Sequence, residues 1–314
     1  MRVARCRANR IRDLALVLVL ASAAHVGHAA TPGPTNPVSG PLMLSDDEFW
    51  GDSERTRGAV VAQIAKSDFH GILLDAPKRV PLAGRDTLPV VGYFVRSLED
   101  DRVLDQERQM VVVAVHQQTG QVVSGLALQP GKLPAPQATP SRNPGKGTKL
   151  DMFTFDLRRT LPLSWATGSY RITVVLGRFI SNSVVVELAG ERGISTPASA
   201  GGSTHIELVR IGTGNSGCKL SGQLVIEAPR PPAAGLAKVV LLVTGLQNPG
   251  PWTVAQDVTS TGNDQPAGTF GGDLMRSAEM PRAPGSYFVY AFSSWGTAGP
   301  VQCRVGGKPL SRTK

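Results

Sequence analysis

A stretch of 38 residues near the middle of the chain reappears, without a gap, 117 positions later. The first copy runs from Phe153 to Gly190 and the second from Phe270 to Gly307. Ten positions are identical, where average residue usage gives roughly two or three. In the first copy they are Phe153, Asp156, Leu157, Arg159, Ala166, Gly168, Ser169, Tyr170, Val184 and Gly190. The repeat predicts two copies of one structural unit with a domain boundary between them.

The first thirty residues have the pattern of a secretory signal peptide. Five arginines between Arg2 and Arg12 precede an apolar run, from Leu14 to Ala24, that is too short to span a bilayer. Small residues up to Ala30 then suit signal peptidase. We therefore expect residues 1–30 to be removed and the protein to be periplasmic or secreted. An uncleaved membrane anchor is the alternative.

The basic charge of the chain is partly a property of this leader. Without it, 28 basic and 23 acidic residues remain, a surplus of only five. No stripe of lysines and arginines is interleaved with aromatic residues, so we expect no nucleic-acid partner. No second apolar span follows, so we expect no transmembrane anchor once the signal is cleaved.

Composition divides the rest of the chain into segments. A proline-rich leader occupies 31–44, and a capping box of Ser45 and Glu48 then opens a helical segment over 45–76. The pattern then changes to short alternating or β-branched runs, which are typical of strands. We expect a first β domain over 77–190, a small polar linker over 191–204, a second β domain over 205–308 and a polar tail over 309–314.

Two blocks of this size with six or seven short strands each predict two tandem immunoglobulin-like antiparallel β-sandwich domains. The repeat supports this fold class. In both copies an Asp-Leu pair lies twelve residues ahead of a Gly-Ser-Tyr that opens a strand. This arrangement resembles the tyrosine corner of immunoglobulin-like sandwiches, which implies that Tyr170 and Tyr287 hydrogen-bond back to the backbone. We expect Asp156 and Asp273 to cap backbone N–H groups of the same scaffold.

The mature chain keeps two cysteines, Cys218 and Cys303. Each alternates with apolar residues on one face of an expected strand, so both thiols should point into the interior. In an exported protein this predicts one structural disulfide, with a reactive thiol pair as the alternative. The first copy has Val186 in the place of Cys303, so its interior should rely on apolar packing.

Groups able to carry catalysis are sparse. The histidines that remain, His70, His116 and His205, have no second histidine or cysteine at metal-ligand spacing, and we expect neither a metal nor a cofactor. The chain also has no Gly-x-Ser-x-Gly nucleophile motif. The acidic run Glu99–Asp101 reads as a solvated loop, with calcium binding as the weaker alternative.

Tryptophans are the candidate binding residues, because exposed rings can stack on sugars or peptides. Trp165 and Trp295 lie in turns and stand at positions where the two copies differ, and Trp252 is the third candidate. Folding back over a strand end is the alternative for Trp165 and Trp295.

These observations favour an exported non-enzymatic protein for adhesion, scaffolding or binding. It would act through loops or strand edges on a protein or glycan of the cell envelope or extracellular space. The first alternative is a secreted hydrolase of cell-wall or extracellular polymer, which needs two carboxylates in one cleft. The second is a periplasmic chaperone-like assembly factor, which the chain resembles only in having two such domains.

Overall fold

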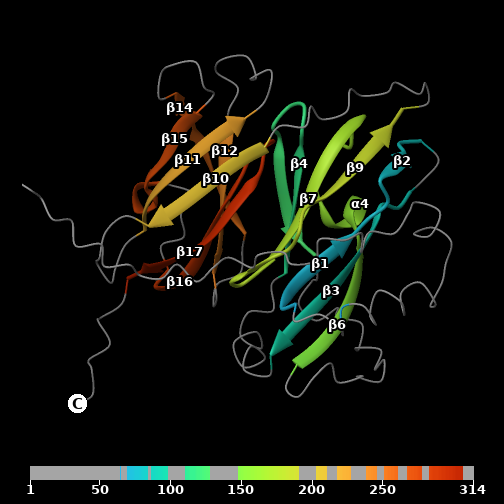
Figure 1. The fold of residues 1–314 in the computed structure, drawn as a ribbon, viewed down its shortest axis with the longest axis horizontal. Coiled ribbons are helices and arrows are strands. Elements are labelled where there is room, and N and C mark those ends of the chain that lie inside the picture. The colour runs from blue at the N-terminus through green and yellow to red at the C-terminus, as the bar shows by residue number, and fades with distance from the viewer. Residues whose placement is uncertain are drawn as a thin grey trace, which may run out of the picture. The chain divides into compact units, whose positions relative to one another are not determined.

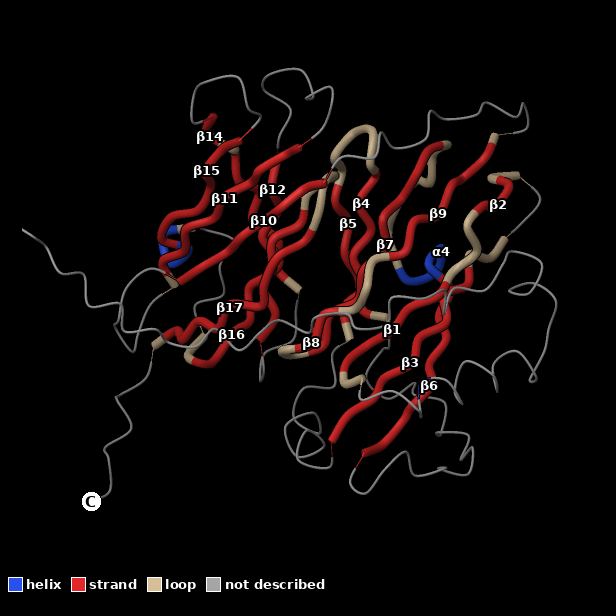
Figure 2. Tube along the Cα trace, in the orientation of Figure 1, coloured by secondary structure: helices blue, strands red, loops and turns tan. Residues whose placement is uncertain are grey.

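Strands dominate the part of the chain that the structure describes (Figures 1 and 2). The structure is a computed structural model, and it describes Ile64 and residues 69–83, 86–97, 110–127, 148–190, 203–210, 218–227, 238–245, 251–260, 267–277 and 283–306. The predicted signal peptide, the proline-rich leader and most of the linker lie outside these ranges, as do Glu99–Asp101.

The first sandwich consists of two sheets. One has the strand order β1-β3-β6, and the other has β2-β9-β7-β4-β5, with β8 paired to β7. Their bounds are β1 (Gly71–Asp75), β2 (Arg79–Pro81), β3 (Pro89–Ser97), β4 (Val111–His116), β5 (Val122–Leu126), β6 (Thr148–Asp156), β7 (Gly168–Leu176), β8 (Phe179–Ile180) and β9 (Val184–Ala189). Neighbouring strands are antiparallel, apart from the parallel pair of β2 and β9.

The second sandwich repeats this plan. Its sheets have the orders β10-β11-β15-β14 and β13-β12-β16-β17. Their bounds are β10 (Ser203–Arg210), β11 (Lys219–Glu227), β12 (Lys238–Gly245), β13 (Trp252–Asp257), β14 (Thr259–Ser260), β15 (Ala267–Asp273), β16 (Gly285–Phe292) and β17 (Thr297–Val305). In immunoglobulin nomenclature these are sheets ABED and C′CFG. The predicted fold class is confirmed.

The helical segment expected over 45–76 is described only at its end. Ile64 is helical, and it lies 2% exposed against the outer face of β1 and β3, beside Phe69 and Tyr93. The first strand already begins at Gly71, within the range assigned to the helix. All five residues of β1 are buried, so its sequence lacks the alternation of apolar and polar residues that predicts a strand.

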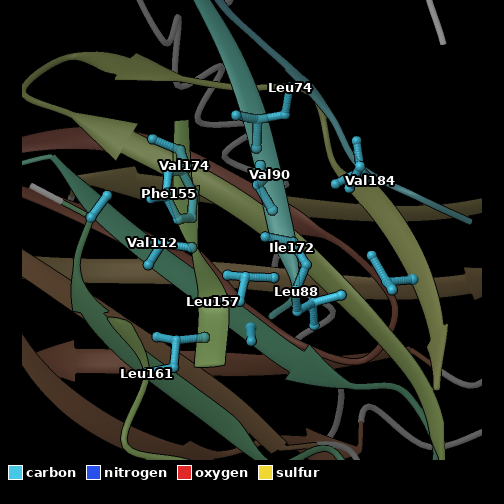
Figure 3. Packing of buried hydrophobic residues seen from close by; sticks show 14 of the residues in the cluster. Leu74, Leu88, Val90, Val112, Phe155, Leu157, Leu161, Ile172, Val174 and Val184 are labelled. Atoms are coloured by element: carbon cyan, nitrogen blue, oxygen red, sulfur yellow. The ribbon is translucent and has the colours of Figure 1, made fainter. Parts of the chain in front are cut away.

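Each sandwich has its own apolar core between its sheets. In the first, Val90 of β3 and Phe155 of β6 meet Val112 of β4 and Ile172 of β7 (Figure 3). These residues alternate along their strands with residues that face outward, as period-two strands require.

The repeated Asp-Leu pair forms a short helical turn in both copies. Asp156 is the N-cap of α4 (Leu157–Thr160), and its carboxylate accepts a hydrogen bond of 3.0 Å from the N–H of Arg158. Asp273 is the N-cap of η1 (Leu274–Arg276), and it accepts one of 3.1 Å from the N–H of Met275. Both aspartates therefore cap backbone donors, as the sequence predicted.

The same turn sets the hydrogen-bonding phase of the neighbouring strands. The N–H of Leu157 donates to the carbonyl of Leu88, and that of Leu274 donates to the carbonyl of Cys218, both at 2.9 Å. Leu88 and Cys218 therefore occupy equivalent positions, although they lie outside the repeated block.

Both repeated tyrosines form the expected corner. The hydroxyl of Tyr170 donates to the carbonyl of Ala166 at 3.2 Å and accepts a hydrogen bond of 3.0 Å from its N–H. The hydroxyl of Tyr287 donates to the carbonyl of Ala283 at 2.7 Å. Each hydroxyl thus ties the start of its strand to the turn four residues earlier.

The predicted disulfide between Cys218 and Cys303 is confirmed. It joins the residue before β11 to a residue near the end of β17, and so links the two sheets of the second sandwich. In the first sandwich the equivalent residues are Leu88 and Val186, both fully buried in the core. One copy therefore has a covalent link where the other has an apolar contact.

A further apolar cluster joins the two sandwiches. Residues Asn36–Lys314 form one compact unit, and within it the outward faces of β4 and β12 share a cluster of buried residues. Val113 and Val175 lie there with Leu242 and Tyr290, none more than 1% exposed. The hydroxyl of Tyr290 donates to the carbonyl of Gly177. These faces are therefore occupied by contact within the chain.

Replacing the cysteines by the residues of the first copy tests their equivalence. Removing a bridge between residues 85 apart should cost about 4–5 kcal/mol in the chain-entropy model. Cys218→Ser/Cys303→Ser should cost a further 1–3 kcal/mol or so, because it buries hydroxyls without partners. Cys218→Leu/Cys303→Val should therefore retain the higher free energy of unfolding in urea titrations. Equal losses in the two variants would contradict the equivalence.

The tyrosine corner predicts a loss of stability when its hydroxyl is removed. Tyr170→Phe removes two hydrogen bonds to Ala166, so it should cost about 2 kcal/mol of the free energy of unfolding. Urea unfolding measures this loss, and a loss below about 0.5 kcal/mol would contradict the geometry.

The shared cluster predicts that one substitution will loosen both sandwiches. Leu242→Ala should cost about 2–5 kcal/mol, because it leaves a cavity in a fully buried contact. Hydrogen-exchange mass spectrometry should show faster exchange in β4 as well as in β12. The matched control is Val209→Ala on β10, where the side chain is 45% exposed. Faster exchange confined to the second sandwich would contradict the coupling.

Candidate functional site

The three candidate tryptophans are all half-buried against a core. Trp165 packs on the first core with its ring centroid 4.9 Å from that of Tyr170. Trp252 and Trp295 pack on the second core, and the ring of Trp252 lies 6.0 Å from that of Tyr287. Packing of this kind explains these residues without a ligand, and a binding role for them remains a prediction.

His116 is held by hydrogen bonds inside the first sandwich. Its Nδ1 accepts a hydrogen bond of 3.2 Å from the N–H of Thr119, so its Nε2–H is the donor toward the carbonyl of Thr167, 3.4 Å away. Its ring also packs edge-to-face with that of Tyr170, with the two ring centroids 4.7 Å apart. His70 is exposed, and the side chain of His205 lies outside the described residues. Within the described ranges no three residues are grouped to hold a metal.

The repeated carboxylates are engaged in the turns that they cap. Asp156 lies 3.4 Å from the guanidinium of Arg159, and Asp273 lies 3.7 Å from that of Arg276. They belong to different sandwiches, whereas hydrolysis of a polymer by two carboxylates needs both in one cleft. Their contacts are those of a scaffold.

Arg171 of β7 is a largely buried cation in the first sandwich. Burial lowers the pKa of its guanidinium. Its neighbours across the sheet are Val115 of β4 and Val185 of β9. Because an arginine starts from a very high pKa, it remains charged at neutral pH.

The clearest difference between the two copies lies at one edge of a sheet. In the second sandwich β15 pairs with β11 on one side and with β14 on the other. In the first, the equivalent strand β6 pairs with β3, and among the described residues no strand pairs with its other side. On that side, β6 (Thr148–Asp156) therefore has an edge of the kind that can pair with a further strand.

The capped turn after β6 determines which backbone groups of β6 face that edge. Residues 88 and 157 pair through a hydrogen bond, and bonded and non-bonded pairs alternate along an antiparallel ladder. Phe153 and Phe155 therefore face β3 with their N–H and C=O groups. Those of Leu150, Met152 and Thr154 point toward the edge.

Apolar side chains accompany these backbone groups. Met152 is 45% exposed on the outer face of the sheet, opposite Tyr93 of β3. Phe153, on the inner face, is half-buried, whereas its equivalent Phe270 is only 7% exposed. Both phenylalanine rings lie over a glycine of the neighbouring strand, where a Cβ would overlap the ring.

A charged pair borders the same edge. The carboxylate of Asp151 lies 2.6 Å from the guanidinium of Arg96, and these side chains are 37% and 16% exposed. Inward-pointing charges of this kind discourage unselective pairing of strand edges. The edge of β6 therefore offers backbone groups for pairing, and the ion pair favours a polar residue beside Asp151.

Sequence reasoning considered strand edges in general but did not find this one. A signal was present, because the segment before β15 contains β14, while the segment before β6 is rich in proline. Five prolines lie between Pro130 and Pro144, and proline cannot donate to a ladder. Comparing these two segments would have pointed to β6.

Comparisons with known proteins add little to this geometry. No family model and no curated protein matches the chain. A solved structure named BspA_C_WT shares 8% identity over 74% of this chain and 96% of its own, with a TM-score of 0.18. The C-terminal domain of AspA, an antigen I/II-family protein of Streptococcus pyogenes, shares 9% identity over 74% and 95%, also with a TM-score of 0.18.

A transglutaminase of red sea bream shares 12% identity over 82% of this chain and 34% of its own, with a TM-score of 0.17. At such scores these similarities carry no argument about function. In the described part of the chain, no helix is long and apolar enough to cross a membrane.

Proposed function

We propose that this chain is an exported, non-enzymatic binding protein of adhesion or scaffolding type, and that it binds a partner protein along the edge of β6. The observation that carries the proposal is the difference between β6 and β15, since β14 pairs with β15 whereas no strand among the described residues pairs with the corresponding side of β6. An open edge offers main-chain hydrogen bonds to an extended segment of another protein.

The contact between the sandwiches supports this choice of surface. The outward faces of β4 and β12 are buried in their shared cluster, so they are not free to bind a partner. The outer face of β1 and β3 is covered in part by Ile64 and Phe69. The edge of β6 retains an exposed apolar side chain, Met152, beside backbone groups that face outward.

A location outside the cytoplasm accords with two features of the chain. The disulfide between Cys218 and Cys303 belongs to the oxidising compartments where such bonds persist. The signal-peptide pattern of residues 1–30 predicts the same destination. We propose the periplasm or the cell exterior as the place where the partner is met.

Photo-crosslinking tests the function in the envelope of the native host. A benzophenone amino acid at position 152 should give discrete adducts with one or a few envelope or extracellular proteins, identified by mass spectrometry. The same amino acid at position 209 is the matched control, because Val209 and Met152 are equally exposed, at 45%. Position 209 should give no such adducts.

Two results would overturn the proposed function. One is an absence of adducts at position 152, or the same adducts at both positions. The other is turnover of a cell-wall or extracellular polymer by the purified protein that is lost on a single Asp or Glu substitution, which would support the hydrolase.

A further inference from the structure

We infer that β6 accepts one antiparallel strand of its partner, in the place that β14 occupies in the second sandwich, and that it selects for the side chains of that strand. This inference rests on the proposed function and deepens it. It names the class of ligand as an extended polypeptide segment with a polar residue opposite Asp151 and apolar residues opposite Met152 and Phe153.

The second sandwich shows how such a strand is seated. Thr259 of β14 pairs with Thr269, and Ser260 pairs with Gly268, both in antiparallel register. At the repeat offset, Thr269 is equivalent to Met152 and Gly268 to Asp151. The ladder phase is also the same in both copies, because the backbone hydrogen bonds of Leu157 to Leu88 and of Leu274 to Cys218 are equivalent. The outward backbone groups of β6 at Met152 therefore lie where those of Thr269 pair with β14 in the second sandwich.

The side chains of β6 define what the incoming strand must carry. A residue opposite Met152 would lie on the outer face of the sheet, where the methionine is 45% exposed, so an apolar side chain would bury area there. A residue opposite Phe153 would lie on the inner face and cover its half-buried ring.

Asp151 imposes the opposite requirement. Its equivalent, Gly268, leaves space that Val258 fills in the second sandwich. In the first sandwich that position carries a carboxylate paired with Arg96 at 2.6 Å. An apolar residue over this ion pair would desolvate it without compensation, whereas a hydroxyl can hydrogen-bond to it. The segment that β6 recognises thus needs a polar side chain beside Asp151, whereas in the second sandwich Val258 occupies the space over Gly268.

A segment of the same chain is the rival occupant. Residues 128–147 connect β5 to β6, as the residues that include β14 connect β13 to β15. The five prolines from Pro130 to Pro144 leave no more than three consecutive residues between them, so they interrupt any ladder, which argues for an occupant from another polypeptide. The experiment includes a variant that separates these two sources.

The probe is a synthetic peptide, Lys-Thr-Val-Val-Ser-Thr-Lys, with both ends blocked. In antiparallel register its valines face Phe153 and Met152 and its serine faces Asp151. The control peptide, Lys-Val-Thr-Ser-Thr-Val-Lys, has the same composition in another order. Amide NMR of the mature protein should show saturable shift changes at Leu150, Met152 and Thr154 with the first peptide, and at least tenfold weaker binding of the second.

Variants of the protein identify the contact. Met152→Pro removes an outward N–H without removing a donor to β3, and it should abolish binding of the peptide. Met152→Ala keeps the backbone edge and loses the apolar side chain, so it should weaken binding several-fold. This variant tests the contact even if the proline variant fails to fold. Val209→Ala removes an equally exposed apolar side chain on β10 and should leave binding unchanged.

Three outcomes would overturn the inference. The first is no binding of either peptide, and the second is equal binding of the two. The third is binding only after residues 131–146 are replaced by a Gly-Ser linker, which would assign the edge to the chain's own segment. Peptide binding without crosslinked envelope proteins would instead leave the inference standing and count against the proposed function.

Discussion

The hydrogen bond from the N–H of Leu157 to the carbonyl of Leu88 determines how the first sandwich meets its surroundings. It lies where the capped turn of Asp156 ends β6, and it sets the phase of the ladder between β3 and β6. With that phase, alternate backbone groups of β6 face the edge. The same bond at Leu274 sets the phase of β15, where β14 pairs with the corresponding groups. In each copy the capped turn thus determines which backbone groups face the edge.

The two sandwiches show which parts of this plan are interchangeable. A buried Leu88 and Val186 in one copy stand where a disulfide links the sheets in the other. The phenylalanine over a glycine is kept in both, although the glycines lie outside the repeated block. The edge strand differs, because β14 has no counterpart among the described residues of the first copy. The conserved contacts support the fold, and the differences leave a surface open.

Much of this architecture is predictable from the sequence. The repeat locates Asp156 and Tyr170 with their counterparts, and side-chain parity identifies the disulfide, because both features depend on local spacing. Period-two patterns also locate the longer strands. The very short β2, β8 and β14 carry too few residues to show a pattern.

The contact between the sandwiches and the edge of β6 were not predictable in the same way. The run Val111–Val115 is apolar on both faces, which identifies a doubly buried strand but not its partner. Pairing of Tyr290 with Gly177 joins residues 113 apart, and no local spacing reports it. The edge of β6 is recognised because no described strand lies where β14 lies beside β15. This difference is seen only when the two copies are compared in three dimensions. The tryptophans attracted attention by residue type, whereas the structure shows all three packed against cores.

The most direct test compares two backbone amides in the free protein. Hydrogen exchange followed by NMR at Met152 and at Thr269 reports whether each outward N–H is bonded to a neighbouring strand. We predict that Met152 exchanges at least tenfold faster than Thr269, because β14 covers the second edge and nothing in the described structure covers the first. Equally slow exchange at both positions would show that β6 is already paired and would contradict the account.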